Sequence, residues 1–233
     1  MQINNISNAR LIGIYDIVED RSLQLSKEHN TQQYLSLEKL IEDCDAVSIS
    51  TPATNHFEVS KMALNNNCHI FVEKPFTKTI KEAKELITLK NTNKLKIQVG
   101  HIERFNPAFI QIMKNNPKPE FIESHRLSSY NPRGTDVDVI LDLMVHDIDL
   151  ILKLVPLKIK NIYASGKAVL TDSIDLANSR IEFENGCTVN LTASRISLKQ
   201  MRQMRIFEKQ SYSLIDFNIP SLNTWSINKD KKL

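Results

Sequence analysis

Residues 69–86 read HIFVEKPFTKTIKEAKEL, and this stretch decides the fold that the sequence predicts. The apolar run at positions 70–72 is typical of a short buried strand, and after Pro75 apolar residues recur at helical spacing. Between the two stand Glu73 and Lys74, which are costly at the end of a buried strand unless they are paired or used. From these residues alone, an ion pair that ends the strand and a pair with a chemical role are equally good interpretations.

The same strand-then-helix pattern extends over the first half of the chain. Strands are expected at residues 10–16, 45–51, 68–74 and 95–101, and helices at 19–30, 55–66 and from residue 80 onward. Strands that alternate with helices form right-handed units around a parallel sheet. We therefore expect an α/β domain with a Rossmann-type doubly wound parallel sheet over residues 1–118.

After residue 119 the pattern changes to one helix followed by strands. A strand is expected at 121–130, a helix at 139–153, and hairpins at 179–194 and 203–217. The first hairpin carries Asn185 and Gly186, which readily accept the left-handed backbone of a tight turn. We expect residues 119–233 to form an α+β domain with a mostly antiparallel sheet.

The helix at 139–153 carries a polar stripe. Asp142, His146 and Asp149 fall at positions i, i+4 and i+7, so they line up on one face. An Asp one turn before a His orients the imidazole for acid–base catalysis, although a solvated helix face gives the same pattern. A metal site of His146, Asp147 and Asp149 is disfavoured, because adjacent residues diverge on a helix and no second histidine is near in sequence. The opposite, packed face is expected to hold Ile140, Leu143, Met144, Ile148, Ile151 and Leu152.

Composition and charge exclude several classes of protein. A formal net charge of +3 over 233 residues is too small to indicate a nucleic-acid or membrane surface. No apolar run reaches the ~20 residues that span a bilayer, and the N-terminus has no signal-peptide pattern. Cys44, Cys68 and Cys187 are widely spaced, which favours a reducing compartment over disulfides or a zinc site. We expect a cytoplasmic protein that binds neither nucleic acid nor membranes.

Four motifs occur in order along the chain: STPxxxH at 50–56, EKP at 73–75, GHxxRFNP at 100–107 and DxxxHDID at 142–149. In order and spacing they resemble the glucose–fructose oxidoreductase and inositol dehydrogenase family (Gfo/Idh/MocA), and the resemblance extends from residue 11 to at least residue 217. It implies an NAD(P)-dependent oxidoreductase that oxidises a secondary hydroxyl of a sugar or nucleotide sugar by hydride transfer to nicotinamide.

The resemblance also assigns roles to individual residues. Lys74, Asp142 and His146 are implied to form the catalytic group in one cleft between the two domains. In these implied roles, His146 takes the hydroxyl proton, Asp142 orients the imidazole of His146, and Lys74 polarises the hydroxyl oxygen. A cis peptide before Pro75 is typical of the family. The implied cofactor-binding residues are Asp16, Thr51, Pro52, Asn55, His56, Glu73, Lys74 and Arg104.

Asp16 bears on the choice of cofactor. It matches the acidic residue that accepts hydrogen bonds from the adenosine ribose, and an acidic side chain there repels the 2′-phosphate of NADP. The resemblance therefore implies NAD rather than NADP.

The substrate is indicated by residues 121–152, which are most similar to the nucleotide-sugar branch of the family, whose substrates include UDP-N-acetylglucosamine. The implied substrate-binding residues are Lys74, Arg126, Arg133, Asp142 and His146. The guanidinium groups of Arg126 and Arg133 suit the oxygens of a diphosphate, but surface salt bridges explain both arginines equally well.

The sequence departs from the family at its start. A dinucleotide fingerprint G-x-G-x-x-G belongs upstream of Asp16, yet the five glycines, at 13, 100, 134, 166 and 186, do not form one. We expect the first, central strand and its glycine loop to be missing, and the C-terminal part to be short as well, as in a fragment, a truncated product or a misassigned start. The neighbouring strands would then keep an unpaired edge, and cofactor binding would be poor.

Two other interpretations follow from this departure. One is an inactive remnant or regulatory binding module that has lost cofactor binding together with the glycine loop. The other is a structural protein that forms homo-oligomers through its C-terminal sheet, a face on which members of the family commonly pair.

Overall fold

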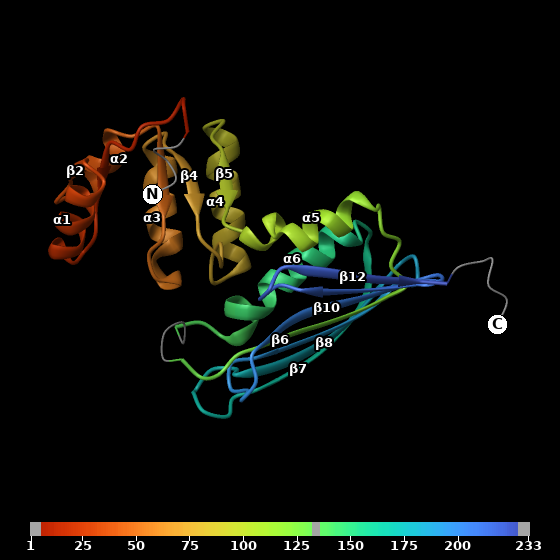
Figure 1. Cartoon of the computed structure of the whole chain (residues 1–233). Helices are drawn as coiled ribbons and strands as arrows, with labels where there is room; N and C mark the ends of the chain where they lie inside the picture. The colour runs from red at the N-terminus through yellow and green to blue at the C-terminus, as the bar shows by residue number, and fades with distance from the viewer. Residues whose placement is uncertain (1–5, 132–135, 228–233) are drawn as a thin grey trace. The chain divides into compact units, whose positions relative to one another are not determined.

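A computed structural model describes residues 6–131 and 136–227 (Figure 1). It contains two compact units, Met1–Gly100 and His101–Leu233. The boundary lies earlier than the expected one at residue 118, because the segment after Gly100 belongs to the core of the second unit, where Phe109 and Ile112 are buried. Within the described part of the chain, no helix is both long and apolar enough to cross a membrane.

Unit 1 alternates strands with helices, as the sequence predicts. Its elements are β1 (Gly13–Ile14), α1 (Glu19–Glu28), β2 (Gln32–Gln33), α2 (Leu37–Glu42), β3 (Ala46–Ile49), the 3-10 turn η2 (Ala53–Asn55), α3 (His56–Asn65), β4 (His69–Val72), α4 (Ile80–Thr92) and β5 (Ile97–Val99). The sequence pattern does not predict β2 or α2, because elements this short show no hydrophobic period.

The strands of unit 1 form two separate parallel sheets. One sheet pairs β1 with β2, and the other has the order β3-β4-β5. In the usual order of a dinucleotide-binding sheet, one further strand lies between the positions that β1 and β3 occupy here. Among the described residues no strand pairs with both β1 and β3.

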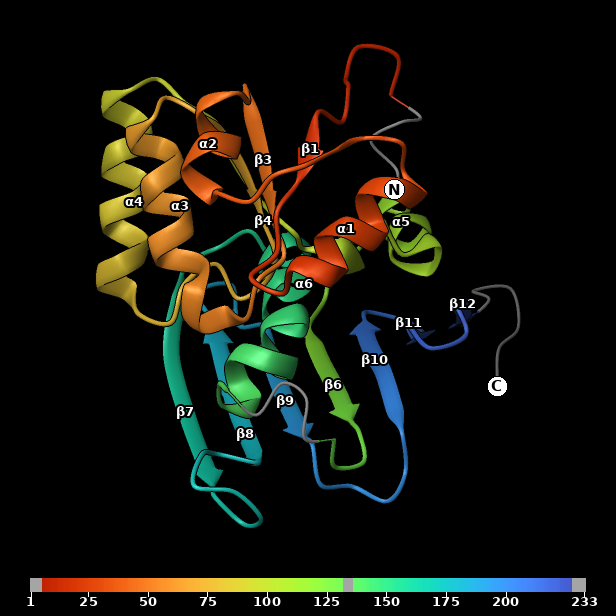
Figure 2. The ribbon, with the colours of Figure 1, turned by 90° about the vertical axis from the view of Figure 1, so that its left-hand side faces the viewer.

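Helices α3 and α4 lie side by side, and α3 packs on β3 and β4 (Figure 2). They bury Leu64 and Leu86 in one cluster with Ile70 and Val72 of β4. Burying four such side chains contributes about 1.5–3 kcal/mol each, so β4 is the best-anchored strand of the unit.

The turn between β4 and α4 is fixed at both ends. At the strand end, the Glu73 backbone N–H donates to the Ile49 carbonyl at 3.0 Å. At the helix start, Thr79 and Glu82 form a capping box, in which each side chain accepts the other's backbone N–H at 3.2 and 3.0 Å. Lys74 therefore lies in a turn that hydrogen bonds hold in place at both ends.

Unit 2 begins with two short helices and continues as one large sheet. Its elements are η3 (Ile102–Phe105), α5 (Pro107–Lys114), β6 (Phe121–Leu127), the π-helical turn η4 (Ile140–Met144), α6 (Val145–Leu154), β7 (Ile159–Lys167), β8 (Leu176–Phe183), β9 (Thr188–Ser194), β10 (Met201–Glu208), β11 (Ser211–Asp216) and β12 (Ser221–Ser226).

The sheet of unit 2 has seven strands in the order β12-β11-β10-β6-β9-β8-β7. Only β6 and β9 pair in parallel; the other neighbours in the described sheet are antiparallel. Helices α5 and α6 lie on one face (Figure 1), and their apolar side chains share a core with the strands. This confirms the expected α+β domain with a mostly antiparallel sheet.

Both expected hairpins form. In the first, the Gly186 backbone N–H donates to the Phe183 carbonyl at 3.0 Å, and the Phe183 N–H donates to the Cys187 carbonyl at 2.9 Å. Gly186 has φ +88, so of the expected pair the glycine takes the left-handed position after a type I turn. In the second hairpin, Gln210 is the second residue of the two-residue loop between Glu208 and Ser211, and it has φ 69.

The helix expected at 139–153 forms, but its first turn is π-helical and not α-helical. A π turn holds more residues than an α turn, so it rotates the residues that follow relative to a regular helix. The buried face accordingly includes Asp147 and Leu150, whereas Leu152, expected to be packed, is 45% exposed.

Candidate functional site

Lys74 lies directly after the carboxyl end of β4, beside Glu73. Because β3, β4 and β5 are parallel, their carboxyl ends share one edge of the sheet, and open α/β sheets bind ligands at that edge. At the end of β5, Gly100 leaves room for the Glu73 carboxylate: a Cβ added to Gly100 would stand 2.8 Å from Glu73 Oε2. The Lys74–Pro75 peptide is cis, as expected.

His56 holds the turn that carries Lys74. Its ring is 1% exposed, with Nδ1 at 2.6 Å from the Pro75 carbonyl oxygen and Nε2 at 2.9 Å from the Thr51 carbonyl oxygen. These contacts tie the turn after β4 to the turn after β3. Because both ring nitrogens face backbone oxygens, the structure gives His56 a positioning role and does not support the expected direct contact with a cofactor.

The other expected cofactor residues of unit 1 lie at strand ends. Asp16 follows β1, and its Oδ1 accepts the Val18 backbone N–H at 2.8 Å. Thr51, Pro52 and Asn55 follow β3 and are exposed. All four therefore stand at carboxyl ends of parallel strands, where a dinucleotide is usually held. Their contact with a cofactor stays a prediction.

Asp142 and His146 lie in unit 2, in η4 and in the first turn of α6, and both side chains are partly buried. The π turn thus coincides with the segment that carries Asp142, and π-helical turns occur frequently at functional sites. Lys74 belongs to unit 1. The convergence of these three side chains stays a prediction.

Arg126 lies within a buried ionic cluster of unit 2. Its side chain is 2% exposed, and its guanidinium donates to Asp147 at 2.8 Å and to Glu103 at 2.9 Å. Burial alone would lower the pKa of Arg126, but the two carboxylates outweigh it and raise that pKa. A guanidinium engaged in this way is not placed to meet a diphosphate. The expected substrate contact is therefore corrected to a structural ion pair, a buried form of the salt-bridge alternative.

The sequence contains one signal for this cluster. Asp147 stands between Met144 and Ile151 at helical spacing, inside the stripe that packs against the core. A carboxylate in such a stripe needs a cationic partner. Spacing alone does not name that partner, because Arg126 comes from a strand 21 residues earlier.

Arg104 pairs with Asp149 through both guanidinium edges, with Nε 2.6 Å from Oδ2 and Nη2 on Oδ1. His101 Nε2 lies 3.7 Å from the same carboxylate, and burial, only partly offset by Asp149, lowers the pKa of His101. Asp149 thus connects α6 directly to the segment around η3, whereas Asp147 does so through Arg126 of β6, which also binds Glu103. The expected role of Arg104 in cofactor binding stays a prediction.

Two further expectations concern Arg133 and metal ions. Arg133 lies outside the described residues. In the described part of the chain, no group of three or more His, Cys, Asp or Glu side chains is arranged to hold a metal ion. Asp147 and Asp149 are instead salt-bridge partners of arginines.

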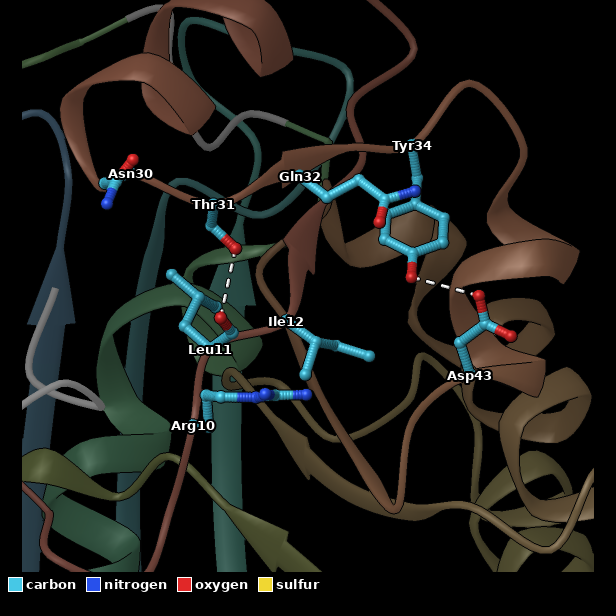
Figure 3. A pocket seen from close by; sticks show the side chains of 8 residues that line it. All are labelled: Arg10, Leu11, Ile12, Asn30, Thr31, Gln32, Tyr34 and Asp43. Carbon is cyan, nitrogen blue, oxygen red and sulfur yellow. Dashed lines mark hydrogen bonds between the residues drawn. The ribbon is translucent and has the colours of Figure 1, made fainter.

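Unit 1 also contains a cavity of about 400 Å³ (Figure 3). It lies where β1 and β2 begin, at the edge away from Asp16, and the Tyr34 hydroxyl donates to Asp43 across one side of it at 3.0 Å. Ligand sites of parallel sheets lie at the opposite edge, so this cavity is not part of the candidate site. Its lining is Arg10, Leu11, Ile12, Asn30, Thr31, Gln32, Tyr34 and Asp43.

The residues present fit part of a dinucleotide. An acidic side chain follows β1 and a lysine follows β4, as the ribose and the reacting end of such a cofactor require. The glycines of the sequence do not supply a phosphate-binding turn, since Gly13 lies in β1 against the ring of Tyr34. The residues present therefore fit the ribose of the cofactor, the place of Lys74 at its reacting end stays a prediction, and the fit to the pyrophosphate is incomplete.

Comparisons with known proteins match both units. The family described as "Oxidoreductase family, NAD-binding Rossmann fold" (GFO_IDH_MocA) matches residues 1–101. The "GFO/IDH/MocA C-terminal domain" matches residues 106–210. The two matches meet close to the boundary between the units at Gly100.

Individual relatives agree with this result. UDP-N-acetylglucosamine 3-dehydrogenase of Acidithiobacillus ferrooxidans is 37% identical over 211 residues, which are 90% of this chain and 67% of that protein. A solved structure of that enzyme has a TM-score of 0.87 at 35% identity and covers 95% of this chain and 73% of its own. The scyllo-inositol 2-dehydrogenase (NAD(+)) of Bacillus subtilis is 26% identical over 84% of this chain and 62% of its own. This chain thus spans 62–67% of the length of these two relatives.

Proposed function

Because the chain belongs to the Gfo/Idh/MocA family of oxidoreductases, we propose that it oxidises a secondary hydroxyl of a sugar or nucleotide sugar with NAD as cofactor. The observation that carries the proposal is Lys74, held on a fixed turn at the ligand edge of β4. Asp142 and His146, one helical turn apart in unit 2, supply the remaining acid–base groups.

The proposed chemistry divides among these three side chains. His146 takes the hydroxyl proton, and Asp142 orients the imidazole and stabilises its charged form. Lys74 donates a hydrogen bond to the oxygen as it becomes a carbonyl. A bound nicotinamide would supply the acceptor for the hydride that leaves the carbon bearing the hydroxyl. The product is a ketone, and the proton leaves through His146.

Asp16 is proposed to hold the adenosine ribose and to favour NAD over NADP. Its carboxylate follows β1 at the ligand edge and would repel a 2′-phosphate. The other residues proposed to bind the cofactor are Thr51, Pro52, Asn55, Glu73, Lys74 and Arg104. Titration of the protein with each dinucleotide tests the preference. Equal or tighter binding of NADP, or an Asp16→Ser variant with an unchanged preference, would contradict it.

A nucleotide sugar is the proposed substrate, with UDP-N-acetylglucosamine as the first compound to test. The support is the 37% identity to a UDP-N-acetylglucosamine 3-dehydrogenase. Of the two arginines expected to meet a diphosphate, only Arg133 is kept in the proposal, because Arg126 is buried in an ion pair.

The activity is tested by mixing the chain with NAD and UDP-N-acetylglucosamine and following the absorbance of NADH. Lys74→Met and His146→Asn should each lower the rate by about 10²–10⁴-fold, as expected for groups that act on the transferred proton or oxygen. Lys78→Met is the matched control, since Lys78 is an exposed lysine on the same turn, and it should leave the rate within about twofold. Equal rates for all three variants would contradict the catalytic roles proposed for Lys74 and His146.

A second candidate function is a binding module without catalysis. The separation of β1–β2 from β3–β4–β5 and the incomplete pyrophosphate site favour it. Calorimetry of NAD binding distinguishes the two candidates, using this chain and a version extended by a strand and glycine loop. At least ~100-fold tighter binding by the extended version would place the missing interactions in that loop. Micromolar binding by the unextended chain would show that another segment holds the phosphates.

We also propose a homo-oligomer that pairs through the sheet of unit 2. The face opposite the helices carries a row of aromatic rings, Phe121, Phe207, Tyr212 and Trp225, whose centroids lie 5.0–5.8 Å apart. Trp225 is 54% exposed, and such rings are enriched at protein interfaces. Cysteines that are all free suit a reducing compartment, so the proposed location is the cytoplasm.

A further inference from the structure

A second buried ion pair of unit 2, between Asp175 and Arg195, lies outside the groups named above. Asp175 directly precedes β8 and Arg195 directly follows β9, so the two residues face each other beyond the paired ends of neighbouring strands. Asp175 is 0% and Arg195 3% exposed, and Arg195 Nε donates to Asp175 Oδ1 at 2.9 Å. Charges this deeply buried are retained only where several polar groups surround them.

Asp175 organises the loop between β7 and β8. Its Oδ2 accepts the backbone N–H groups of Val169, Leu170 and Thr171 at 2.9, 2.7 and 2.9 Å. Burial alone would raise the pKa of Asp175, but these hydrogen bonds outweigh it and hold that pKa far below its usual range. The loop is thereby wrapped around a single carboxylate.

Arg195 connects this loop to the chain that enters η4. Its Nη1 donates to the Val137 carbonyl at 2.8 Å, and its Nη2 donates to Ser173 Oγ at 2.5 Å. Beside it, the Val139 backbone N–H donates to the Ile174 carbonyl at 2.9 Å. Residues 137–139 are therefore held from two sides, by Arg195 at the Val137 carbonyl and by Ile174 of the loop that Asp175 organises.

The same residues contact the first residues of η4. Asp138 accepts the backbone N–H of Asp142 on its carbonyl and that of Leu141 on Oδ1, both at 2.9 Å. A displacement of residues 137–139 would therefore be transmitted directly to Asp142, and along the helix to His146.

We propose that Asp175 and Arg195 are positioning residues, which fix the start of η4 and so set the orientation of Asp142 toward His146. This inference rests on the proposed function in one respect: the orientation of Asp142 toward His146 matters for catalysis only if these two residues act on the substrate. The placement itself follows from the hydrogen bonds of unit 2.

The test compares Arg195→Met, Arg195→Lys and Asp175→Asn with the unaltered full chain, without any cofactor. Amide hydrogen exchange at Val139 and Asp142 should become about tenfold faster in Arg195→Met, while amides of β10 and β11 stay within about twofold, because only the local opening changes. In Arg195→Lys, the exchange rates at Val139 and Asp142 should lie between those of the unaltered chain and those of Arg195→Met, since one ammonium cannot span both Asp175 and the Val137 carbonyl. The titration midpoint of the His146 ring, followed by NMR, should shift in the same order.

Two controls separate positioning from general stability. Ile206→Ala opens the core of unit 2 away from η4, and it should speed exchange throughout the sheet without moving the His146 titration. Arg205→Met removes an exposed ion pair with Glu123 and should change neither readout. Uniform loss of protection in Arg195→Met, or an unchanged His146 titration, would overturn the inference. If the local effects appear but the unaltered chain oxidises no sugar, the proposed function fails and the positioning role stands.

Discussion

Replacement of Arg126 by Met tests the ionic cluster that joins α6 to β6 and η3. The change removes the cation and leaves two carboxylates, Asp147 and Glu103, whose side chains are 3% and 13% exposed. Breaking a buried pair by removing one partner costs about 3–5 kcal/mol, because the remaining charge stays out of water. We expect the free energy of unfolding of unit 2 to fall by about that amount.

Urea denaturation measures this loss directly. Trp225 is the only tryptophan of the sequence and lies in β12, so its fluorescence reports on unit 2 alone. With an m-value of about 2 kcal/mol/M, the midpoint should shift by roughly 1.5–2.5 M. The exposed pair of Arg205 and Glu123, with side chains 44% and 30% exposed, is the matched control, and Arg205→Met should cost about 1 kcal/mol or less.

A second variant separates lost attraction from stranded charge. If stranded carboxylates cause the cost, Arg126→Met combined with Asp147→Leu should recover much of the stability, since an apolar replacement of a buried pair is often neutral. A loss below about 1 kcal/mol for Arg126→Met, equal to that of Arg205→Met, would refute the cluster as a structural element.

Three further changes have defined outcomes. Thr79→Ala removes the capping box of α4 and should lower the stability of unit 1 by about 1 kcal/mol in chemical denaturation followed by circular dichroism; an unchanged midpoint would contradict the cap. Gly100→Ala places a methyl 2.8 Å from Glu73 Oε2, the mobile end of that side chain, so the carboxylate should shift and the stability of unit 1 should fall by about 1 kcal/mol or less in the same denaturation experiment; a larger loss would show that the carboxylate is fixed in place. The depressed pKa of Asp175 stabilises unit 2 above the ordinary value of about 3.9, and this contribution is lost as the pH falls below it; Asp175→Asn should flatten the acid side of the stability profile, and an unaltered profile would count against the carboxylate.

The longer elements of the fold are predictable from the sequence because they carry a clear period. Helices α1, α3 and α4 show the helical spacing of apolar residues, and the hairpin at Gly186 carries a turn residue suited to its backbone. The pattern does not predict α2, α5, β7 or β12, which are short or lie at exposed positions of the sheet. The boundary between the units also differs from the expected one, because the burial of α5 depends on the sheet that it packs against.

Parts of the candidate site are beyond the reach of sequence patterns for a different reason. The edge position of Lys74 follows from strand-then-helix alternation, which is a local property. The partner of Arg126 comes from another element, and the bond from the Val145 N–H to the Ile140 carbonyl that marks the π turn leaves no trace in the hydrophobic period. The sequence motif predicts that His56 contacts the cofactor. In the structure its ring is buried between the Pro75 and Thr51 carbonyls, which gives it a positioning role.

The separation of β1–β2 from β3–β4–β5 has a consequence for how this protein can be used. Among the described residues, β1 and β3 each have one side without a strand partner, and open strand edges accept a further strand. A synthetic peptide with a Val- and Ile-rich strand and a glycine turn is therefore a natural partner for complementation in trans. We expect such a peptide to pair with β1 and β3 and so to join the two sheets, and we predict that the joined sheet holds the proposed cofactor more tightly, which titration with NAD in the presence and absence of the peptide measures.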